Sequence, residues 1–114
     1  MPFIEREIDQ IQKIVGGFCE RRVPEHVKDK IRLGYTIANH DVVIVEARPW
    51  RNESSEWIEI EIAKLHYVCK RDEWQLYWKR ASGKWWPYET HSESRTLETM
   101  IKEIDLDSDG CFFG

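Results

Sequence analysis

Apolar residues near the N-terminus repeat with the period of an amphipathic helix. Between residues 2 and 22 they recur every three or four positions and would form one stripe: Ile4, Ile8, Ile11, Val15 and Phe18. Val23-Pro24 ends this helix, because the residue before a proline is driven out of the helical region. Gly16-Gly17 lies in its middle and lowers helix stability by about 1 kcal/mol per glycine relative to alanine. The glycine pair therefore indicates a kink or a close backbone contact.

After residue 30 the pattern changes to the alternation that is typical of strands. A half-buried strand is predicted over residues 31–37, followed by a turn over 38–41. Residues 42–47 are apolar at both parities except at Glu46. We therefore expect this second strand to be central and covered on both faces.

A third strand is predicted over residues 57–67, and its pattern changes phase. The isoleucines share one parity and the later apolar residues the other: Ile58, Ile60 and Ile62 against Leu65 and Tyr67. A continuous strand would turn the later pair outward. The sequence therefore predicts a β-bulge near Ala63-Lys64 that keeps both sets on one face.

Two more strands are predicted over residues 74–80 and 84–89, joined by a turn over 81–83. Pro87 cannot donate a ladder hydrogen bond, which places the fifth strand at an edge of the sheet. A last helix is predicted over 95–105, with Ser94 as its N-cap. We therefore expect one α+β domain over residues 1–114: an N-terminal helix, a five-stranded antiparallel meander and a C-terminal helix.

Composition limits the class of protein. The chain has 114 residues and a formal net charge of -4, so it lacks the overall basic character of a nucleic-acid-binding domain. Its longest aliphatic run, Val42 to Val45, is far shorter than the roughly 20 residues of a membrane span. Cys19, Cys69 and Cys111 have no paired spacing, which favours reduced thiols. We therefore expect a cytoplasmic protein without a membrane partner.

Two sets of acidic residues suggest hydrolysis as an alternative. Glu59 and Glu61 would lie on one strand face about 6.6 Å apart, a separation of the order that glycosidases use. Glu46, Glu61 and Lys64 could converge as a variant nuclease site, although Ile62 occupies the position where that motif needs an acid. Strand alternation alone explains these glutamates as a solvated face. We expect no catalysis and keep a small hydrolase as the second alternative.

No cofactor or metal motif is complete. The residues from Asp105 to Gly110 match the first half of a calcium loop, but the sequence has no acid at its twelfth position. The pair His66-x-x-Cys69 lacks the second pair of a zinc site. We expect no cofactor and no metal. The segment Cys111-Phe112-Phe113 is predicted to fold back and be buried.

Basic and aromatic residues gather between residues 64 and 88. The candidate binding residues are Lys64, Tyr77, Lys79, Arg80, Lys84, Trp86 and Tyr88. Proteins that bind single-stranded nucleic acid combine basic and aromatic side chains in this way. A nucleic-acid or anionic-ligand binder is therefore the first alternative.

A protein interface is the leading interpretation of these aromatic residues. Trp85 and Trp86 would place a tryptophan on each face of an edge strand, and two short helices cannot cover both faces of the sheet. A large exposed aromatic patch usually marks an interface. We therefore expect a binding or accessory protein that forms a homodimer. The segment 111–113 is the competing cover for the same face.

The chain from residue 31 to 114 resembles a known family. The matching stretches are Arg48-Pro49, Ile62-Ala63-Lys64, Trp74 to Trp78, Gly83-Lys84-Trp85 and the closing residues Asp109 to Gly114. Their order and spacing together resemble the bacterial domain of unknown function 3024. The resemblance implies no established activity, cofactor or catalytic residue. It implies a genetic context, since similar small proteins are often carried on mobile integron gene cassettes.

Overall fold

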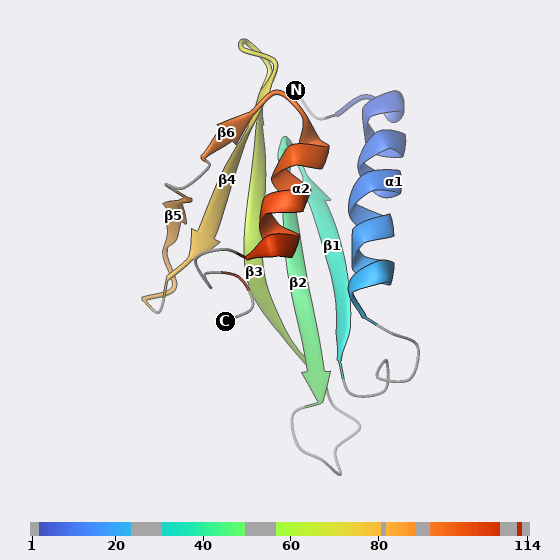
Figure 1. The fold of residues 1–114 in the computed structure, drawn as a ribbon, viewed down its shortest axis with the longest axis vertical. Helices are drawn as coiled ribbons and strands as arrows, with labels where there is room; N and C mark the ends of the chain where they lie inside the picture. The colour runs from blue at the N-terminus through green and yellow to red at the C-terminus, as the bar shows by residue number, and fades with distance from the viewer. Residues whose placement is uncertain are drawn as a thin grey trace.

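The structure is a computed structural model that describes residues 3–23, 31–49, 57–80, 82–88, 92–107 and 112. Two helices, α1 (Glu5–Arg22) and α2 (Leu97–Leu106), pack against one face of an antiparallel sheet (Figure 1). The strands are β1 (Arg32–Ala38), β2 (Asp41–Pro49), β3 (Trp57–Val68), β4 (Glu73–Lys79), β5 (Trp85–Pro87) and β6 (Glu93–Ser94). Neither described helix is long and apolar enough to cross a membrane.

The sheet order is β1-β2-β3-β4-β5, which confirms the predicted α+β fold and meander. The sequence pattern did not predict β6, which pairs with β4 beside β5 and ends at Ser94, the residue expected to cap the C-terminal helix. Ser94 therefore lies in a strand, and Thr96 is the N-cap of α2. A two-residue strand leaves no hydrophobic periodicity, because its pairing depends on the neighbouring β4.

The predicted β-bulge is present one residue before the expected position. Ala63 pairs with Ile44, whereas Glu61 pairs with Val45, so Ile62 is the extra residue of β3. Because of this extra residue, Leu65 points to the same face as Ile60, although the two positions differ in parity. The change of phase in the apolar pattern had predicted this outcome.

The side chains between the helices and the sheet form the core. The helix-facing sheet residues include Val42, Ile44, Leu65 and Leu76, all 0% exposed. The helices contribute their predicted apolar stripes: Ile11, Val15 and Phe18 from α1, with Leu97, Met100, Ile101 and Ile104 from α2. Ile4 is a difference, because it precedes the first turn of α1 and is 61% exposed. Phe3 is buried instead and stacks on Trp74 with ring centroids 5.6 Å apart.

The expectation that β2 is covered on both faces is wrong for the described residues. We call the side on which α1 and α2 pack the covered face and the opposite side the open face. Val42 and Ile44 point to the covered face, whereas Val43 and Val45 are half-buried on the open face. Two short helices have room for one face only, and longer side chains of β3 and β4 shield the valines in part.

Phe112 confirms the predicted burial of the C-terminal segment at the one residue described there. Its ring packs on Tyr88 with centroids 4.9 Å apart, and its backbone N–H donates to the Asp107 carboxylate at 3.0 Å. Tyr88 belongs to the core beneath the helices, so Phe112 extends the covered face. Cys111 and Phe113 lie outside the described residues.

Candidate functional site

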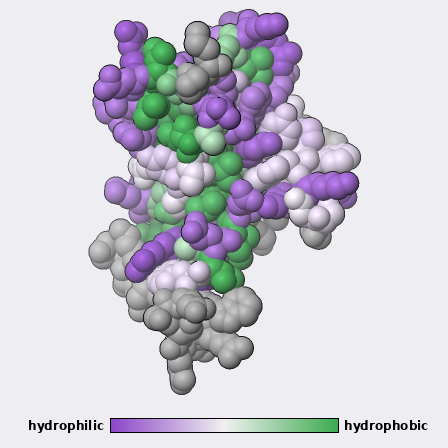
Figure 2. Space-filling model, turned by 180° about the vertical axis from the view of Figure 1, so that it is seen from behind, coloured by the Kyte–Doolittle hydropathy of each residue, from purple (hydrophilic) through white to green (hydrophobic). Residues whose placement is uncertain are grey.

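The open face is the candidate binding surface, because no described helix packs on it. Figure 2 shows apolar residues down the middle of this face between hydrophilic ones. Directly paired residues of antiparallel strands point to the same side, so the register assigns the open-face neighbours. Thr36, Val43, Lys64, Tyr77 and Pro87 form one row across the strands. Small side chains on β1 and β2 thus lie beside longer ones on β3 and β4.

Three residues of the predicted site, Lys64, Tyr77 and Lys79, come together on the open face with Trp85, which the prediction did not include. The Lys64 Nζ lies 4.9 Å from the Tyr77 ring centroid and 5.4 Å from that of Trp85. The Lys79 Nζ lies 5.4 Å from the same Trp85 centroid and 2.5 Å from a Glu61 carboxylate oxygen. Cations over rings gain about 0.5–1 kcal/mol at exposed sites. We call Lys64, Tyr77, Lys79 and Trp85 the aromatic-lysine cluster.

The other predicted site residues lie elsewhere. Trp86 pairs with Trp78 on the side of the covered face, is 44% exposed, and has the Arg80 guanidinium 5.0 Å from its ring. Lys84 is exposed in the hairpin between β4 and β5. Tyr88 is a core residue at 1% exposed and lines no surface. Strand alternation separates the predicted set, because neighbouring residues of one strand point to opposite faces.

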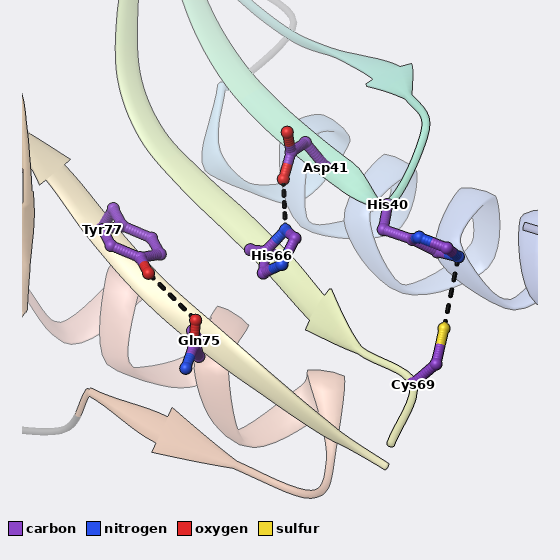
Figure 3. A network of polar contacts seen from close by, with 6 residues as sticks. All are labelled: His40, Asp41, His66, Cys69, Gln75 and Tyr77. Carbon is purple, nitrogen blue, oxygen red and sulfur yellow. Dashed lines mark hydrogen bonds and ion pairs between the residues drawn. The ribbon is translucent and has the colours of Figure 1, made fainter. Parts of the chain in front are cut away.

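A row of polar contacts beside this cluster is absent from the sequence-based prediction. Figure 3 shows the Asp41 carboxylate 2.7 Å from the His66 Nδ1, and the Tyr77 hydroxyl donating to Gln75 at 2.9 Å. Asp41 pairs with His66 and His66 with Gln75, so the three residues form a row across β2, β3 and β4. The sequence does contain a signal for this row: the short β1–β2 turn and the lengths of the strands fix which residues pair, once the position of the bulge in β3 is known.

The same view shows a second pair at the end of the sheet. The Cys69 Sγ lies 3.3 Å from the His40 Nε2, so Cys69 contacts His40 and not the His66 of the sequence motif. The His40 ring also meets Phe3 edge to face at 5.3 Å. Tyr67 borders this pair, and its hydrogen bond to Asp72, with burial and the Asp72 charge, raises the pKa of Tyr67 to about 12. In the described residues, no group of three or more His, Cys, Asp or Glu side chains could hold a metal ion.

The acidic residues of the hydrolase alternative do not converge. Glu46 is 6% exposed on the covered face and is bonded to Arg48, whereas Glu61 pairs with Val45 on the open face. Lys64 and Glu46 therefore lie on opposite sides of the sheet. Glu59 and Glu61 are both exposed on the open face, as alternation alone predicts.

A family model described as a domain of unknown function (DUF3024) matches residues 3–114. No curated protein and no solved structure matches the chain. The family match confirms the resemblance seen in the sequence and extends it through α1. The family's description gives no activity, so the geometry of the open face carries the functional argument. Because the match covers nearly the whole sequence, the chain belongs to the DUF3024 family.

Proposed function

We propose that this chain is a non-catalytic binding protein that forms a homodimer through the open face of its sheet. One observation carries the proposal: both helices pack on the covered face. The rings of Tyr77 and Trp85 therefore remain half-exposed on the opposite side. Phe112 packs on Tyr88 in the helix-covered core, so this residue of the competing cover lies on the wrong side of the sheet to shield them. Large rings of this kind dominate the energetics of interfaces.

The charges of the open face favour a second copy over an anionic ligand. Lys64 and Lys79 share the face with the exposed carboxylates of Glu59 and Glu61. A two-fold axis would bring the basic part of one copy near the acidic part of the other. A phosphate chain on the same surface would meet those carboxylates, and Lys79 would first have to leave Glu61.

Light scattering after size exclusion at micromolar concentration tests the homodimer. We expect a mass twice the 13.7 kDa of the chain. Trp85→Glu and Tyr77→Glu each place a charge in the interface and are expected to give the monomer mass with an unchanged far-UV spectrum. Trp86→Glu is the matched control, because Trp86 lies on the other side of β5 and its variant should remain dimeric. A wild-type mass of one chain, or a dimer that Trp85→Glu leaves intact, contradicts the proposal.

Single-stranded nucleic acid is the second candidate, favoured by the contact of both lysines with Trp85. Such binding would quench tryptophan fluorescence and weaken steeply with salt, because phosphate contacts release counterions. We expect no quenching by a single-stranded oligonucleotide at low salt. Saturable quenching that Lys64→Ala and Lys79→Ala abolish would instead establish this candidate.

The proposal includes a cytoplasmic location and the context that the family resemblance implies, a bacterial protein carried on mobile gene cassettes. Cys19 and Cys69 are both free thiols, which fits a reducing compartment. A protein that needs only a second copy of itself to complete its surface is also suited to transfer between genomes as one gene.

A further inference from the structure

The outer edge of β1 is unpaired in the part of the chain that the structure describes. The Tyr67 N–H bonds to the His40 carbonyl at 2.9 Å, so the paired residues Asp41 and His66 do not bond each other across β2 and β3. Odd-numbered residues of β2 therefore direct their backbone groups at β1 and bond its even-numbered residues. The N–H and C=O groups of Leu33, Tyr35 and Ile37 consequently point outward. No described strand pairs with this edge.

Natural sheets protect such edges with charges, prolines, bulges or a covering helix or loop. From Leu33 to Ala38, β1 contains no charged residue and no proline, and its register with β2 is regular. The opposite edge differs, since β5 ends at Pro87 and β6 begins at Glu93. From Leu33 to Ala38, β1 itself thus has no charge, proline or bulge against an added strand, and the described element that covers this edge is α1.

A groove runs along this edge beneath α1. Its volume is about 740 Å³, and residues of α1 and β1 line it, among them Gly16, Glu20, Leu33 and Tyr35. In Figure 1, α1 runs antiparallel to β1 and extends past the edge of the sheet. The helix therefore forms a roof over the position that an added strand would take.

Nothing in the part of the chain that the structure describes requires glycine at two positions beside the groove. A Cβ at Gly16 would meet only the Tyr35 ring, at an ordinary 3.7 Å, and one at Gly34 would meet only a Val45 methyl at 4.0 Å. Neither residue has the positive φ that requires glycine, and glycine weakens both helices and strands. A glycine in a strand often marks the close approach of another backbone. Both glycines keep space clear on either side of the open edge.

The side of α1 above the groove is acidic. Gly16 and Glu20 line the groove, and helical spacing places Asp9 and Glu5 on the same stripe. The three carboxylates are exposed, and among the described residues none of them is in an ion pair. Among the described residues, Lys13 is the basic one that lines the groove, and it lies on the same stripe, four residues after Asp9. The stripe thus has three carboxylates against one lysine, a balance that is complementary to a basic segment.

We infer that the groove between α1 and the β1 edge binds an extended basic peptide segment of another protein, which adds to the sheet as a strand antiparallel or parallel to β1. Its backbone bonds the outward groups of Leu33, Tyr35 and Ile37, as in other cases of strand addition. Its lysines or arginines lie beneath Asp9 and Glu20. A second copy of β1 fits less well, because two α1 helices that extend past their sheets would collide and β1 contains only Arg32 as a base.

A fluorescein-labelled peptide tests the inference by anisotropy. The probe alternates lysine with valine and threonine over about nine residues, long enough at about 3.3 Å per residue to span β1. We expect saturable binding that weakens with salt, and at least tenfold weaker binding of a matched peptide with glutamate in place of lysine. Equal binding of both peptides, or of neither, overturns the inference.

Matched variants identify the groove. Gly16→Gln fills it and should weaken the lysine peptide at least tenfold, whereas Gly16→Ala removes the same glycine with little bulk and should not. The double variant Asp9→Lys with Glu20→Lys should abolish binding. Glu93→Lys with Glu98→Lys makes the same change in net charge away from the groove and should retain most of it. Binding that Gly16→Gln leaves unchanged contradicts the inference.

Amide hydrogen exchange reads the added strand directly. The peptide should protect the N–H groups of Leu33, Tyr35 and Ile37, while those of Gly34 and Thr36 are already bonded to β2 and change little. The monomeric Trp85→Glu variant should show the same protection, which separates this surface from the homodimer. Protection of the three amides that rises with protein concentration in the absence of peptide would assign the edge to a second copy and overturn the inference.

Discussion

Glu46 is the buried charged side chain of the described core, and it forms an ion pair with Arg48. It lies opposite Leu33 on the covered face at 6% exposed, and Arg48, two residues on, reaches back to it from a half-exposed position. Arg48→Ala would leave the carboxylate without this partner and should lower the free energy of unfolding by about 1–3 kcal/mol. Urea denaturation measures the loss. A similar loss in Glu46→Gln with Arg48→Ala would show that the ion pair is not its cause.

The two described cysteines should differ in reactivity. Burial, with a contribution from the Glu20 charge, raises the pKa of Cys19 to about 11, so Cys19 remains a thiol near neutral pH. Cys69 is exposed beside His40. Brief treatment with iodoacetamide at pH 8, followed by peptide mass mapping, should show Cys69 modified and Cys19 protected until urea is added. Modification of Cys19 at the rate of Cys69 in the folded protein would contradict this expectation.

The same shifts predict a loss of stability at alkaline pH. Cys19 has a pKa of 9.0 when unfolded and about 11 when folded, and Tyr67 has 10.0 and about 12. Between these values the unfolded chain has lost the proton that the folded chain keeps, so the free energy of unfolding falls as pH rises from about 9 to 12. The urea midpoint should drop over this range and drop less in Tyr67→Phe. A midpoint that is constant up to pH 11 would contradict the prediction.

At the scale of elements, hydrophobic periodicity was sufficient to place both helices and the longer strands. The bulge at Ile62 could be predicted because β3 changes parity in its own sequence. The strand β6 and the cap at Thr96 could not, since a two-residue strand exists only through its pairing with β4. The prediction that both faces of β2 are covered was wrong. Consecutive aliphatic residues show that a strand is apolar on both sides, but they do not show that a second layer packs on it.

Glycine has opposite roles in two elements. Gly83 turns the β4–β5 hairpin with a φ of +84°, and Gly17 lies in α1, where a Cβ would meet only the flexible end of Arg21 at 3.6 Å. Gly83→Ala should lower the free energy of unfolding by about 1–2 kcal/mol, because side chains are strained at positive φ. Gly17→Ala should raise it by up to about 1 kcal/mol. Thermal or urea melts compare the two variants. Changes of the same sign in their free energies of unfolding would contradict these opposite roles.

At the scale of the whole molecule, the candidate site was only half predictable. Alternation indicates which residues of one strand share a face, so Tyr77 and Lys79 could be grouped from the sequence. Grouping them with Lys64 and separating them from Trp86 required the register between strands. The partners of His40 and His66 depended on the same register. The sequence pattern places Tyr88 at the surface, whereas in the structure Phe112 packs on its ring.

Phe112 connects the end of the chain to the core and should contribute measurably to stability. It is 6% exposed and packs on Tyr88. Phe112→Ala should lower the free energy of unfolding by about 3 kcal/mol, the low end for a buried ring. Leu106→Ala is the control, since Leu106 is 63% exposed and should change the free energy by less than about 0.5 kcal/mol. Urea melts in which the two variants lose the same amount would contradict the role of Phe112.

The unlike edges of the sheet have a consequence for how copies can assemble. An edge-to-edge contact between β1 of one copy and the β5–β6 side of the next would repeat without end and build a filament. Tyr77 of β4 pairs with Pro87 and Gln75 pairs with Glu93. The pairing therefore advances two residues along β4 but six along the β5–β6 side, which has four more residues than β4 can pair. An interrupted edge with a proline cannot template a continuous strand. An assembly that adds a strand on the β1 side alone would therefore be closed and would not extend into a filament.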